Sequence, residues 1–306
     1  MVKRRFGRIG VLAGGPSSER EISLRSGRAV HDALLGEGFD SIFLDVKNNI
    51  DEIIRKSCID VAFIALHGRF GEDGTVQKML EGADIPYTGS GVEASAAALD
   101  KVVSKELFIR SLIPVPKHMV LTRGELYKND FGKLGMPIVV KPHLEGSSIG
   151  LSIVRDIDLL PGAIDRAFEY GDKVILEEYI DGRELTVGIL NDEALPVVEI
   201  VPKDKVYDYA AKYKDSTTKY LVPAPIPENI SGEAMRLGLM AHKTLGCRSF
   251  SRVDMMMVPS GGIFVLEVNT IPGMTERSLL PKAAMATGLR FSSLCVKILE
   301  AAIKDH

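Results

Sequence analysis

The sequence has little cysteine and none of the spacings that mark a disulfide framework or a zinc site. Its three cysteines, Cys58, Cys247 and Cys295, are far apart, and neither a CxxC pair nor an HExxH motif occurs. A sparse, odd-numbered set is typical of chains in a reducing compartment. We therefore expect a cytoplasmic protein whose function needs neither disulfide bonds nor zinc.

Long apolar runs are missing as well. No stretch approaches the roughly 20 apolar residues of a membrane span. The basic start of the chain leads into fewer apolar residues than the roughly 7–15 of a secretory signal, so we interpret residues 8–13 as a first β-strand. The formal net charge of -3 gives no reason to expect nucleic acid or an acidic membrane surface as a partner.

The first hundred residues alternate strand signals with helix signals. Such βαβ alternation predicts a parallel sheet covered by helices, with ligand contacts at the carboxyl ends of the strands. A chain of 306 residues is long enough for about two or three domains, and we assign residues 1–100 to an N-terminal α/β substrate domain. Its expected strands and helices, in chain order, are residues 8–13, 22–35, 40–46, 50–56 and 60–68.

Two further units are expected, and they mix helices and strands in an α+β arrangement. We assign residues 101–183 to a central unit and residues 184–306 to a C-terminal unit. The latter contains a polar stretch, residues 202–227, with four of the eight tyrosines of the chain. Loops of that length are usually functional lids or disordered, and the aromatic content argues against disorder, so we predict a lid. Other expected elements are residues 102–111, 137–142, 151–154, 158–170, 173–180, 184–190, 194–201, 232–245 and 291–304.

A hairpin is predicted near the C-terminus, where segments 251–258 and 263–269 flank Pro259-Ser260-Gly261-Gly262. A four-residue loop would pair Val258 with Ile263. Counting outward, the next facing pairs of interest are Asp254 with Glu267 and Arg252 with Asn269. Because side chains alternate along a strand, these four lie on one face. The other face is expected in the core and consists of Val253, Met255, Met257, Phe264, Leu266 and Val268.

Two carboxylates on this face would repel each other across the strands. Asp254 and Glu267 would have Cβ atoms roughly 5 Å apart, and a divalent cation would relieve the repulsion. Mg²⁺ is commonly held by one or two carboxylates together with substrate phosphates, and Asn269 would add a third oxygen. Arg252 is a permanent cation suited to a carboxylate or a developing negative charge. The alternative is a surface hairpin with a cross-strand Arg–Glu pair.

A glycine- and serine-rich loop, residues 143–150, follows the apolar strand that ends at Lys141-Pro142. Its glycines would let the backbone close over phosphates, and Lys141 and Lys101 would supply positive charge. It is not a Walker A motif, because GxxxxGK[ST] is absent. An ordinary β-turn is the alternative.

Three further positions attract attention. Glu177 and Glu178 end an apolar strand, where a hinge could grip a base through its backbone, although a solvated strand end is an alternative. A Pro-Gly turn after Asn269 leads to Ser278 and could offer N–H groups to an anion. His67 lies at the end of the third expected strand and is a candidate for orienting the second substrate, with a structural histidine as the alternative.

Taken in chain order, short motifs in this sequence resemble those of the D-alanine–D-alanine ligases, a family of ATP-grasp enzymes. They cover nearly the whole chain, and although each is weak alone, the ordered set is very specific. The motifs are Gly14-Gly15-Pro16-Ser17-Ser18-Glu19-Arg20-Glu21-Ile22-Ser23, His67-Gly68 with Gly71-Glu72-Asp73-Gly74, Pro86-Tyr87-Thr88-Gly89-Ser90-Gly91, Asp100-Lys101, Lys141-Pro142 with Glu145-Gly146-Ser147-Ser148, Tyr207-Asp208-Tyr209 with Lys212-Tyr213, Arg252-Val253-Asp254 and Glu267-Val268-Asn269.

The resemblance implies an ATP-grasp fold behind an N-terminal parallel-sheet domain, with ATP between the central and C-terminal units. It implies ATP-dependent ligation of two D-alanine molecules through a D-alanyl phosphate, for peptidoglycan precursor synthesis, in a homodimer. It also implies two Mg²⁺ ions, for which Mn²⁺ can substitute.

The resemblance also implies roles for individual residues. The nucleotide would be held by Lys101, Lys141 and Lys212, by Glu177 with the backbone of Glu178 and Ile180 at adenine, and by Glu184 at the ribose. The metal ligands would be Asp254, Glu267 and Asn269. The D-alanine contacts would be Glu19, tied through Ser147 to the lid residue Tyr213; Ser278 and the Leu279 backbone at the second carboxylate; His67; and Arg252 with the Gly273 N–H at the oxyanion.

The sequence departs from the family pattern in the hinge, where Glu178 replaces a common Lys, and at Ile271, which replaces a small residue or Leu. The hinge contact is largely backbone, so only the detail of adenine binding is affected. Relatives that make the D-alanyl-D-lactate ester tend to carry Phe or a different loop at the position of Tyr213, which therefore favours a dipeptide product.

Other functions compete with this interpretation. A dinucleotide oxidoreductase would fit the first strand with Gly14-Gly15, but a GxGxxG motif is missing. A regulatory protein that binds nucleotide without chemistry would not need both Asp254 and Glu267. An ATP-grasp ligase with D-serine or D-lactate as its acceptor is the third alternative.

Overall fold

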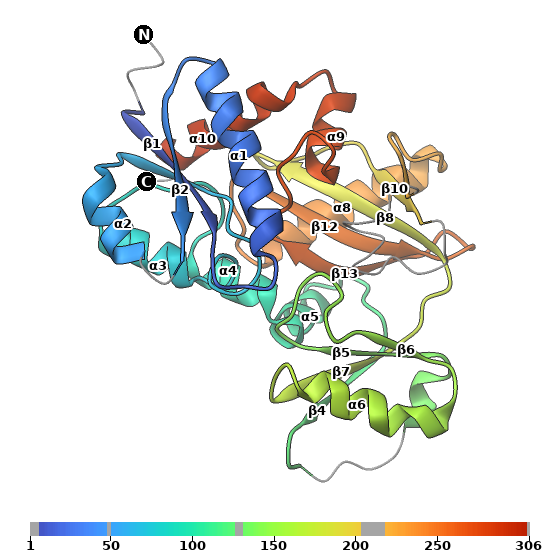
Figure 1. Cartoon of the computed structure of the whole chain (residues 1–306). Coiled ribbons are helices and arrows are strands. Elements are labelled where there is room, and N and C mark those ends of the chain that lie inside the picture. Colours follow the sequence, from blue (N-terminus) through green and yellow to red (C-terminus); the bar gives the residue numbers. More distant parts are fainter. Residues whose placement is uncertain (1–5, 48–49, 126–130, 203–217, 305–306) are drawn as a thin grey trace.

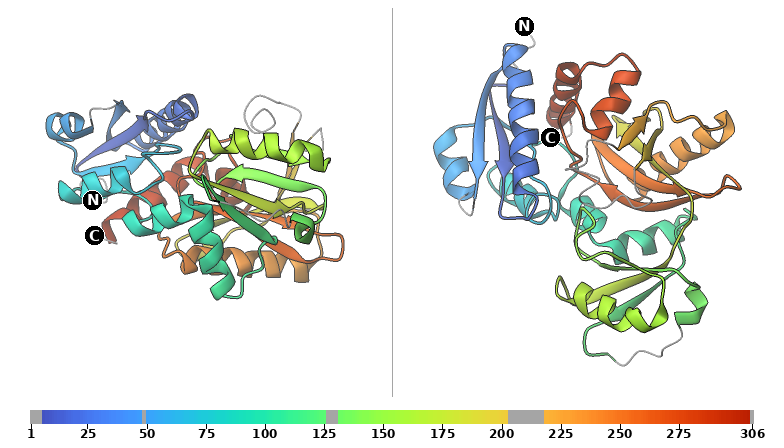
Figure 2. Two further views of the ribbon diagram at one scale, coloured as in Figure 1. Left: turned by 90° about the horizontal axis from the view of Figure 1, so that it is seen from below. Right: turned by 45° about the vertical axis from the view of Figure 1, so that its right-hand side comes forward.

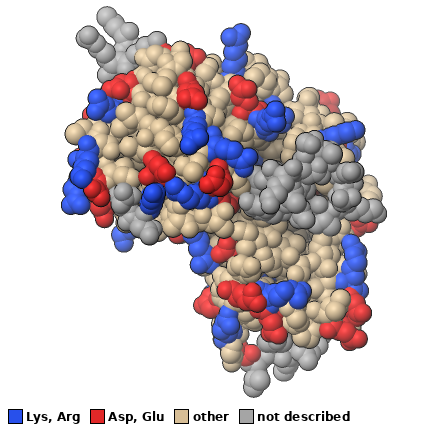
Figure 3. Space-filling view, viewed as in Figure 1, with Lys and Arg blue, Asp and Glu red and all other residues tan. Residues whose placement is uncertain are grey.

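The computed structural model describes residues 6–47, 50–125, 131–202 and 218–304. Its strands form three sheets, with helices packed against them (Figures 1 and 2). In the described residues, no helix is long and apolar enough to cross a lipid bilayer. On the face shown in Figure 3, Lys and Arg side chains are interspersed with Asp and Glu, so neither sign of charge dominates it.

The N-terminal sheet is parallel, with strand order β2-β1-β3, which confirms the predicted α/β arrangement. The third strand is shorter than predicted, because it ends at Ile64 and leaves His67 in the loop beyond it. The elements of this part are β1 (Arg8–Gly14), α1 (Arg20–Gly36), β2 (Asp40–Val46), α2 (Ile50–Ser57), β3 (Val61–Ile64), α3 (Thr75–Gly82) and α4 (Val92–Leu99).

The central sheet is antiparallel, with strand order β4-β7-β5-β6, and its apolar face packs against α6. The helix predicted over residues 158–170 begins as a 3-10 turn, and Pro161 then occupies the first turn of α6. The elements are α5 (Lys101–Arg110), β4 (His118–Thr122), η2 (Phe131–Leu134), β5 (Ile138–Pro142), β6 (Ser152–Val154), η3 (Ile157–Leu159), α6 (Leu160–Phe168) and β7 (Lys173–Glu178).

The largest sheet has strand order β11-β10-β8-β12-β13, with β9 paired to β8, and it is antiparallel. The strand predicted over residues 194–201 is interrupted at Pro196, which has no N–H to donate to a ladder. The elements are β8 (Arg183–Leu190), β9 (Glu193–Ala194), β10 (Val198–Val201), β11 (Lys219–Leu221), α8 (Glu228–Thr244), β12 (Phe250–Met257), β13 (Ile263–Asn269), α9 (Leu279–Ala286) and α10 (Phe291–Lys304).

Helices cover both faces of this sheet. Apolar residues of α8 pack on one face, and those of α9 and α10 share a second core with α1 and the N-terminal strands (Figure 1). The last helix of the chain therefore lies against its first. The combination of a parallel sheet with two antiparallel sheets confirms the predicted α/β and α+β class, while the limits of the three predicted domains stay a prediction.

The predicted lid, residues 202–227, is described only at its ends. Its last part contains β11, which pairs with β10, so this segment is a sheet edge instead of a loop. Tyr207, Tyr209, Lys212 and Tyr213 lie outside the described residues.

Candidate active site

Two cavities meet at the hairpin formed by β12 and β13. The larger, of about 570 Å³, is lined by Arg252 and Asn269, and the smaller, of about 190 Å³, is lined by Asp254. Glu267 lines both of them. The polar face of the hairpin is therefore the wall that the two cavities share.

The register of the hairpin agrees with the sequence prediction at the site but not at the turn. Arg252 pairs with Asn269 and Asp254 with Glu267, as predicted. The predicted pairing of Val258 with Ile263 is wrong, because Met257 faces Ile263 across a five-residue turn closed by the Val258 N–H and the Gly262 carbonyl at 2.9 Å. A β-bulge beside Asp254 restores the predicted register.

The bulge changes which side chains reach the core. An extra residue reverses the alternation of faces along the strand. Ile263 and Val265 are therefore buried, and the prediction that Phe264 and Leu266 would be core residues is wrong. Leu266 instead lines the smaller cavity together with Met256. The bulge thus supplies that cavity with the apolar side chain of Leu266 beside the carboxylates.

The negative charges on the hairpin are already paired with cations of the protein. Arg252 donates to both carboxylate oxygens of Asp254, at 2.8 and 2.6 Å. The Lys101 Nζ lies 3.2 Å from an oxygen of Glu267. Repulsion between the two carboxylates therefore does not by itself require a metal ion, contrary to the argument from sequence. The surface-hairpin alternative is wrong too, because Asp254 is only 5% exposed.

The oxygen atoms around Asp254 are of the kind that binds a metal ion, but they do not form a dense cluster of ligands. In the described part of the chain, no group of three or more His, Cys, Asp or Glu side chains is arranged to hold a metal ion. The Asn269 amide donates to Asp254 at 3.1 Å, so it lies beside the carboxylate as predicted. Two carboxylates and one amide oxygen fit Mg²⁺ when substrate phosphates complete its coordination.

Thr186 also positions Asp254, although sequence reasoning missed it. It lies opposite Asp254 in β8, and its hydroxyl donates to the carboxylate at 2.7 Å. The signal in the sequence was a polar residue within an apolar strand, two positions after Glu184 and hence on the same face.

Helix α5 brings Lys101 to the smaller cavity and carries a second lysine, Lys105, which is fully buried. The Asp100 carboxylate accepts hydrogen bonds from the N–H groups of Val102 and Val103, so the helix begins at Lys101. Lys101 and Lys105 are one turn apart and face the same way. Lys105 was missed in the sequence, although its spacing from Lys101 was a usable signal.

Glu177 lies between two of the lysines. Its carboxylate is 2.8 Å from the Lys105 Nζ and 3.0 Å from the Lys141 Nζ. Although burial by itself raises the pKa of Glu177, the charges of Lys141 and Lys105 outweigh it and lower the pKa to about 2. The alternative of a solvated strand end is therefore wrong for Glu177, which is 3% exposed and held ionised.

The remaining walls of the smaller cavity form a slot between the two antiparallel sheets. Apolar side chains from both sheets line it, namely Val139, Leu151, Ile153, Met256 and Leu266. Glu178, Tyr179, Ile180 and Glu184 line the hinge end. Glu178 exchanges hydrogen bonds with the Lys117 backbone, at 2.9 Å through its own N–H and 2.9 Å through its carboxylate. The slot can therefore take a flat apolar group, with charged phosphates toward the lysines.

Glu19 connects the N-terminal part of the chain to the loop predicted to hold phosphates. It is 6% exposed at the start of α1, and its carboxylate accepts a hydrogen bond from Ser147. The same loop is held from the other side, since the Lys101 Nζ donates to the Glu145 carbonyl at 2.8 Å. The ordinary-turn alternative does not account for these contacts, which fix the loop between the two cavities.

His67 is buried between three partners in the larger cavity. Its Nε2 lies 3.0 Å from the Ser26 hydroxyl, its Nδ1 donates to the Ile271 carbonyl at 2.9 Å, and Glu72 is 3.5 Å away. Burial by itself lowers the pKa of His67, but Glu72, together with Glu19 and the Ile271 carbonyl, outweighs it and raises the pKa above its ordinary value. Glu72 and Ser26 therefore join the site, and sequence reasoning assigned neither of them a role.

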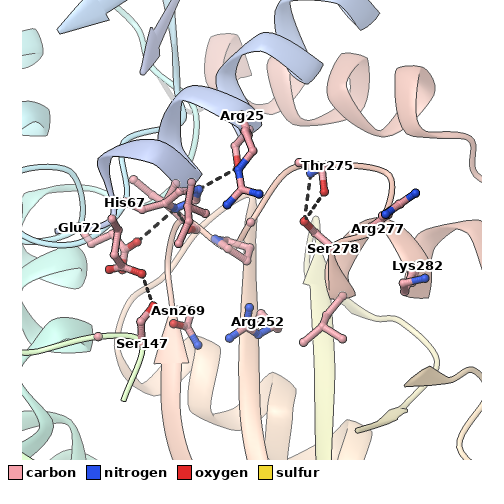
Figure 4. Close-up of a pocket in the computed structure, with 18 of the residues that line it drawn as sticks. Arg25, His67, Glu72, Ser147, Arg252, Asn269, Thr275, Arg277, Ser278 and Lys282 are labelled. Carbon is pink, nitrogen blue, oxygen red and sulfur yellow. Dashed lines mark hydrogen bonds and ion pairs between the residues drawn. The ribbon is translucent and has the colours of Figure 1, made fainter. Parts of the chain in front are cut away.

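The far wall of the larger cavity is the start of α9. Ser278 precedes the helix, and its hydroxyl accepts the Thr275 N–H at 3.1 Å, while the N–H of Leu279 is one of the first N–H groups of the helix, which have no partner within it. A Cβ added to Gly273 would lie 3.0 Å from the Ser278 hydroxyl, so glycine keeps this corner open. Figure 4 shows Arg252 and Asn269 pointing into the space that Arg25 enters from α1, with Ser278 and Lys282 across it.

Comparisons with known proteins agree with this geometry. The family model described as D-ala D-ala ligase C-terminus matches residues 107–300, and the one described as D-ala D-ala ligase N-terminus matches residues 45–90. The D-alanine–D-alanine ligase of Citrifermentans bemidjiense is 48% identical over 295 residues, which cover 96% of this chain and 96% of that protein.

The chain belongs to the D-alanine–D-alanine ligase family. The ligase of Geotalea uraniireducens is 46% identical over 96% of this chain and 95% of that protein. The crystal structure of the Bacillus anthracis ligase complexed with ATP superposes with a TM-score of 0.87, at 36% identity over 98% of each chain. A second crystal structure of the Bacillus anthracis ligase gives a TM-score of 0.89 at 39% identity and the same coverage.

Within this family fold, the residues singled out from the sequence fall into two groups. The group that lines the smaller cavity is Lys101, Lys141, Glu177, Glu178, Ile180, Glu184 and Asp254. The group that lines the larger one is Glu19, His67, Ser147, Arg252, Asn269, Gly273, Ser278 and Leu279, and Glu267 belongs to both. Apart from Lys212 and Tyr213, which are not described, the predicted residues therefore line two adjoining cavities.

Proposed function

We propose that this chain uses ATP to join two D-alanine molecules into D-alanyl-D-alanine, releasing ADP and phosphate, for peptidoglycan precursor synthesis. One observation carries the proposal: an apolar slot with lysines adjoins a larger polar cavity, and Glu267 lines both. The names of the relatives, and the ATP in the Bacillus anthracis complex, support it.

ATP would occupy the smaller cavity. Adenine would lie in the apolar slot against Met256 and Leu266, near Glu177 and the backbone of Glu178 and Ile180. Glu184 would take the ribose, and Lys101 and Lys141 the phosphates, with Lys212 as a further contact. Phosphate transfer depends mainly on positioning and on positive charge around the phosphate oxygens, which this arrangement of lysines supplies.

Mg²⁺ would be held by Asp254, Glu267 and Asn269, at the boundary between the two cavities. Two ions are proposed, with Mn²⁺ as a substitute. When bound, they would neutralise charge on the phosphates of ATP. The protein's own part is to aim both carboxylates at that boundary, with Thr186 fixing one of them.

The D-alanine molecules would occupy the larger cavity. Glu19, held by Ser147, would bind the ammonium of the first. Ser278 and the Leu279 N–H would bind the carboxylate of the second, which His67 would help to orient. Arg252 and the Gly273 N–H would face the reacting carbon.

The chemistry follows from this placement. The carboxylate of the first D-alanine attacks the γ-phosphorus of ATP, which forms D-alanyl phosphate and ADP. The amine of the second D-alanine, after losing a proton, attacks the acyl carbon, and the tetrahedral oxyanion then expels phosphate. Arg252 and the Gly273 N–H would stabilise that oxyanion. A lid carrying Tyr213, in the part of residues 202–227 that precedes β11, would shield the acyl phosphate from water.

The division into units 1–100, 101–183 and 184–306 is part of the same proposal. ATP would lie between the second and third units, and D-alanine between these and the first. A homodimer is proposed on the resemblance alone.

The test is to measure ADP release with ATP and D-alanine alone. The measurement is then repeated with D-serine or D-lactate added as a second acceptor. We expect ADP and D-alanyl-D-alanine in equal amounts with D-alanine alone. Faster ADP release after addition of D-serine or D-lactate, with a mixed product, would overturn the assignment of the acceptor. No amino-acid-dependent ADP release would overturn the proposed ligase.

A further inference from the structure

Lys105 is a deeply buried charge to which the proposed reaction assigns no part. It is 0% exposed in α5, whereas Lys101 and Lys141 are 6% and 8% exposed. An ammonium group taken out of water is costly unless it is paired. Burial also lowers the pKa of Lys105, and Glu177 opposes that change. A neutral side chain would fill this space at lower cost, so the charge calls for an explanation.

Glu177 is the partner that Lys105 shares with Lys141. One carboxylate oxygen lies 2.8 Å from the Lys105 Nζ, and the other lies 3.0 Å from the Lys141 Nζ. Of these two lysines, Lys141 lines the smaller cavity and Lys105 is enclosed by protein. Only one of the two ammonium groups can therefore meet a ligand.

The position of Lys141 creates a conflict for nucleotide binding. An ammonium held by Glu177 has part of its charge compensated and one of its three N–H donors occupied, so it binds a phosphate less strongly than a released one would. If Lys141 left, and Glu177 had no other cation, a buried carboxylate would lose its compensation, which is strongly unfavourable. Lys101 does not replace it, because it is paired with Glu267 and with the Glu145 carbonyl.

We propose that Lys105 is a positioning residue that keeps Glu177 compensated, so that Lys141 can exchange Glu177 for a phosphate of the nucleotide. The two lysines on Glu177 are thus unequal: Lys105 stays, and Lys141 moves. This inference rests on the proposed binding of ATP in the smaller cavity, but not on the ligation step.

The role of Lys105 predicts a specific pattern in a double-mutant cycle. Lys105→Met leaves Glu177 with Lys141 alone, which should weaken binding of a non-hydrolysable ATP analogue about 10-fold, the size expected for a charge-assisted contact. In a Glu177→Gln background no buried carboxylate needs compensation. There the same Lys105→Met change should alter the affinity less than about twofold.

Isothermal titration calorimetry with the analogue measures all four proteins, at temperatures well below their thermal unfolding. If Lys105→Met folds poorly, Lys105→Gln replaces it, because it removes the charge but keeps a hydrogen-bond donor. Lys56→Met, on exposed α2, is the control and should bind like the parent chain. In steady-state assays, the KM for ATP should rise in Lys105→Met and the KM for D-alanine should not.

Equal loss of analogue affinity in both backgrounds would overturn the proposal, since it would mean a merely structural role for Lys105. Unchanged affinity in Lys105→Met would overturn it as well. Failure of the ligase proposal would look different: the parent chain would release no D-alanine-dependent ADP, while the binding cycle, which uses no D-alanine, would still give its answer.

Discussion

The two cavities use charge in different ways. In the smaller cavity, opposite charges touch directly: Glu177 lies between Lys105 and Lys141, and Glu267 lies beside Lys101. In the larger cavity, hydroxyls and backbone groups also stand next to the charged groups, as when Ser147 donates to Glu19, although His67 lies near Glu72 and Arg252 pairs with Asp254 at the shared wall. A site of direct ion pairs can exchange one partner for an anionic ligand. A site built from hydroxyls and backbone groups holds its shape.

The two cavities also differ in the sequence distance of the contacts that build them. Glu19 and Ser147 are 128 residues apart, and His67 and Ile271 are 204 apart. In the smaller cavity, Glu177 is 36 residues from Lys141 and 72 from Lys105, although Lys101 and Glu267 are 166 residues apart. Substitutions in the smaller cavity should therefore act through charge, and those in the larger one through geometry.

The largest effect is expected at the shared wall. Asp254→Asn should lower kcat for ADP release on the order of 100-fold or more, because loss even of a group that supports a metal ligand costs about 10–100-fold. Asn has the same shape and can still accept from Thr186, so circular dichroism and thermal unfolding should show an intact fold. Asp192→Asn, at an exposed ion pair, is the matched control and should behave like the parent chain.

Near-normal phosphate release by folded Asp254→Asn would contradict the metal assignment. A metal titration adds an independent readout. The variant should need more Mg²⁺ for half-maximal rate than the parent chain, since one proposed ligand oxygen has lost its charge.

A smaller effect is expected in the larger cavity. Glu19→Gln should raise the KM for D-alanine roughly 10- to 100-fold, because a hydrogen bond to a charged group contributes about 1.5–3 kcal/mol. The KM for ATP should stay within about twofold, because Glu19 does not line the nucleotide slot. Steady-state kinetics with each substrate varied in turn separates the two constants.

Glu21→Gln is the matched control, because Glu21 lies exposed on the same helix two residues later. It should change neither constant. If Glu19→Gln raised both KM values equally, the proposed placement of ATP in the smaller cavity and D-alanine in the larger one would be wrong.

Two buried histidines provide a comparison within one molecule. His67 is next to Glu72, which raises its pKa, whereas burial lowers the pKa of His242 to about 4. Glu72→Gln should therefore lower the pKa of His67 and leave the pKa of His242 unchanged. A titration followed by NMR of the histidine Cε1–H signals measures both.

The same substitution should change stability in a defined pH range. Because the folded-state pKa of His67 is raised, its contribution is fully present below pH 6.5 and is lost as the pH rises through the folded value. At low pH, the free energy of unfolding of the parent chain should exceed that of Glu72→Gln. The difference should be about 1.4 kcal/mol for each unit by which Glu72 raises the pKa of His67. Urea unfolding at several pH values tests this, and a difference that grows at high pH would contradict it.

The hairpin shows what a sequence can predict and where it stops. Strand alternation correctly paired Asp254 with Glu267, because both strands are short and close in sequence. The turn was predicted with one residue too few, and the bulge that compensates has no clear sequence signal, so Leu266 was wrongly placed in the core. The longer turn and the bulge shift the register in opposite directions. The pairing is therefore correct at the site and wrong only between the site and the turn.

The partners of the candidate residues were harder to predict than the residues themselves. The resemblance singled out His67, but its contact with Ile271 exists only after the first and last parts of the chain have packed together. Lys105 and Thr186 carried local signals, helix spacing and strand alternation, that were not used. Asp254 is paired with Arg252, and Glu267 with Lys101. The spacing of residues in the sequence does not predict which carboxylate each of these cations contacts.

The smallest effect is expected at Ser26, which positions the turn carrying Gly273. Its hydroxyl accepts the Met274 N–H at 3.2 Å and lies 3.0 Å from the His67 Nε2. Ser26→Ala would leave that buried N–H unpaired, at a cost of about 1–3 kcal/mol in stability. The turn would be held less firmly, so kcat should fall only a few-fold, roughly 3- to 10-fold, with the KM for ATP unchanged.

Ser23→Ala is a matched control on the same helix. Ser23 is equally buried and accepts the Gly14 N–H at 2.8 Å, but it lies outside the residues that line the larger cavity. Both variants should lose similar stability in urea unfolding, because each hydroxyl accepts one buried N–H and has one further buried partner, the Ala65 carbonyl for Ser23 and His67 for Ser26. Only Ser26→Ala should lose kcat. Equal kcat for the two folded variants would mean that Ser26 supports the fold alone, and that the turn holding Gly273 needs no help from α1.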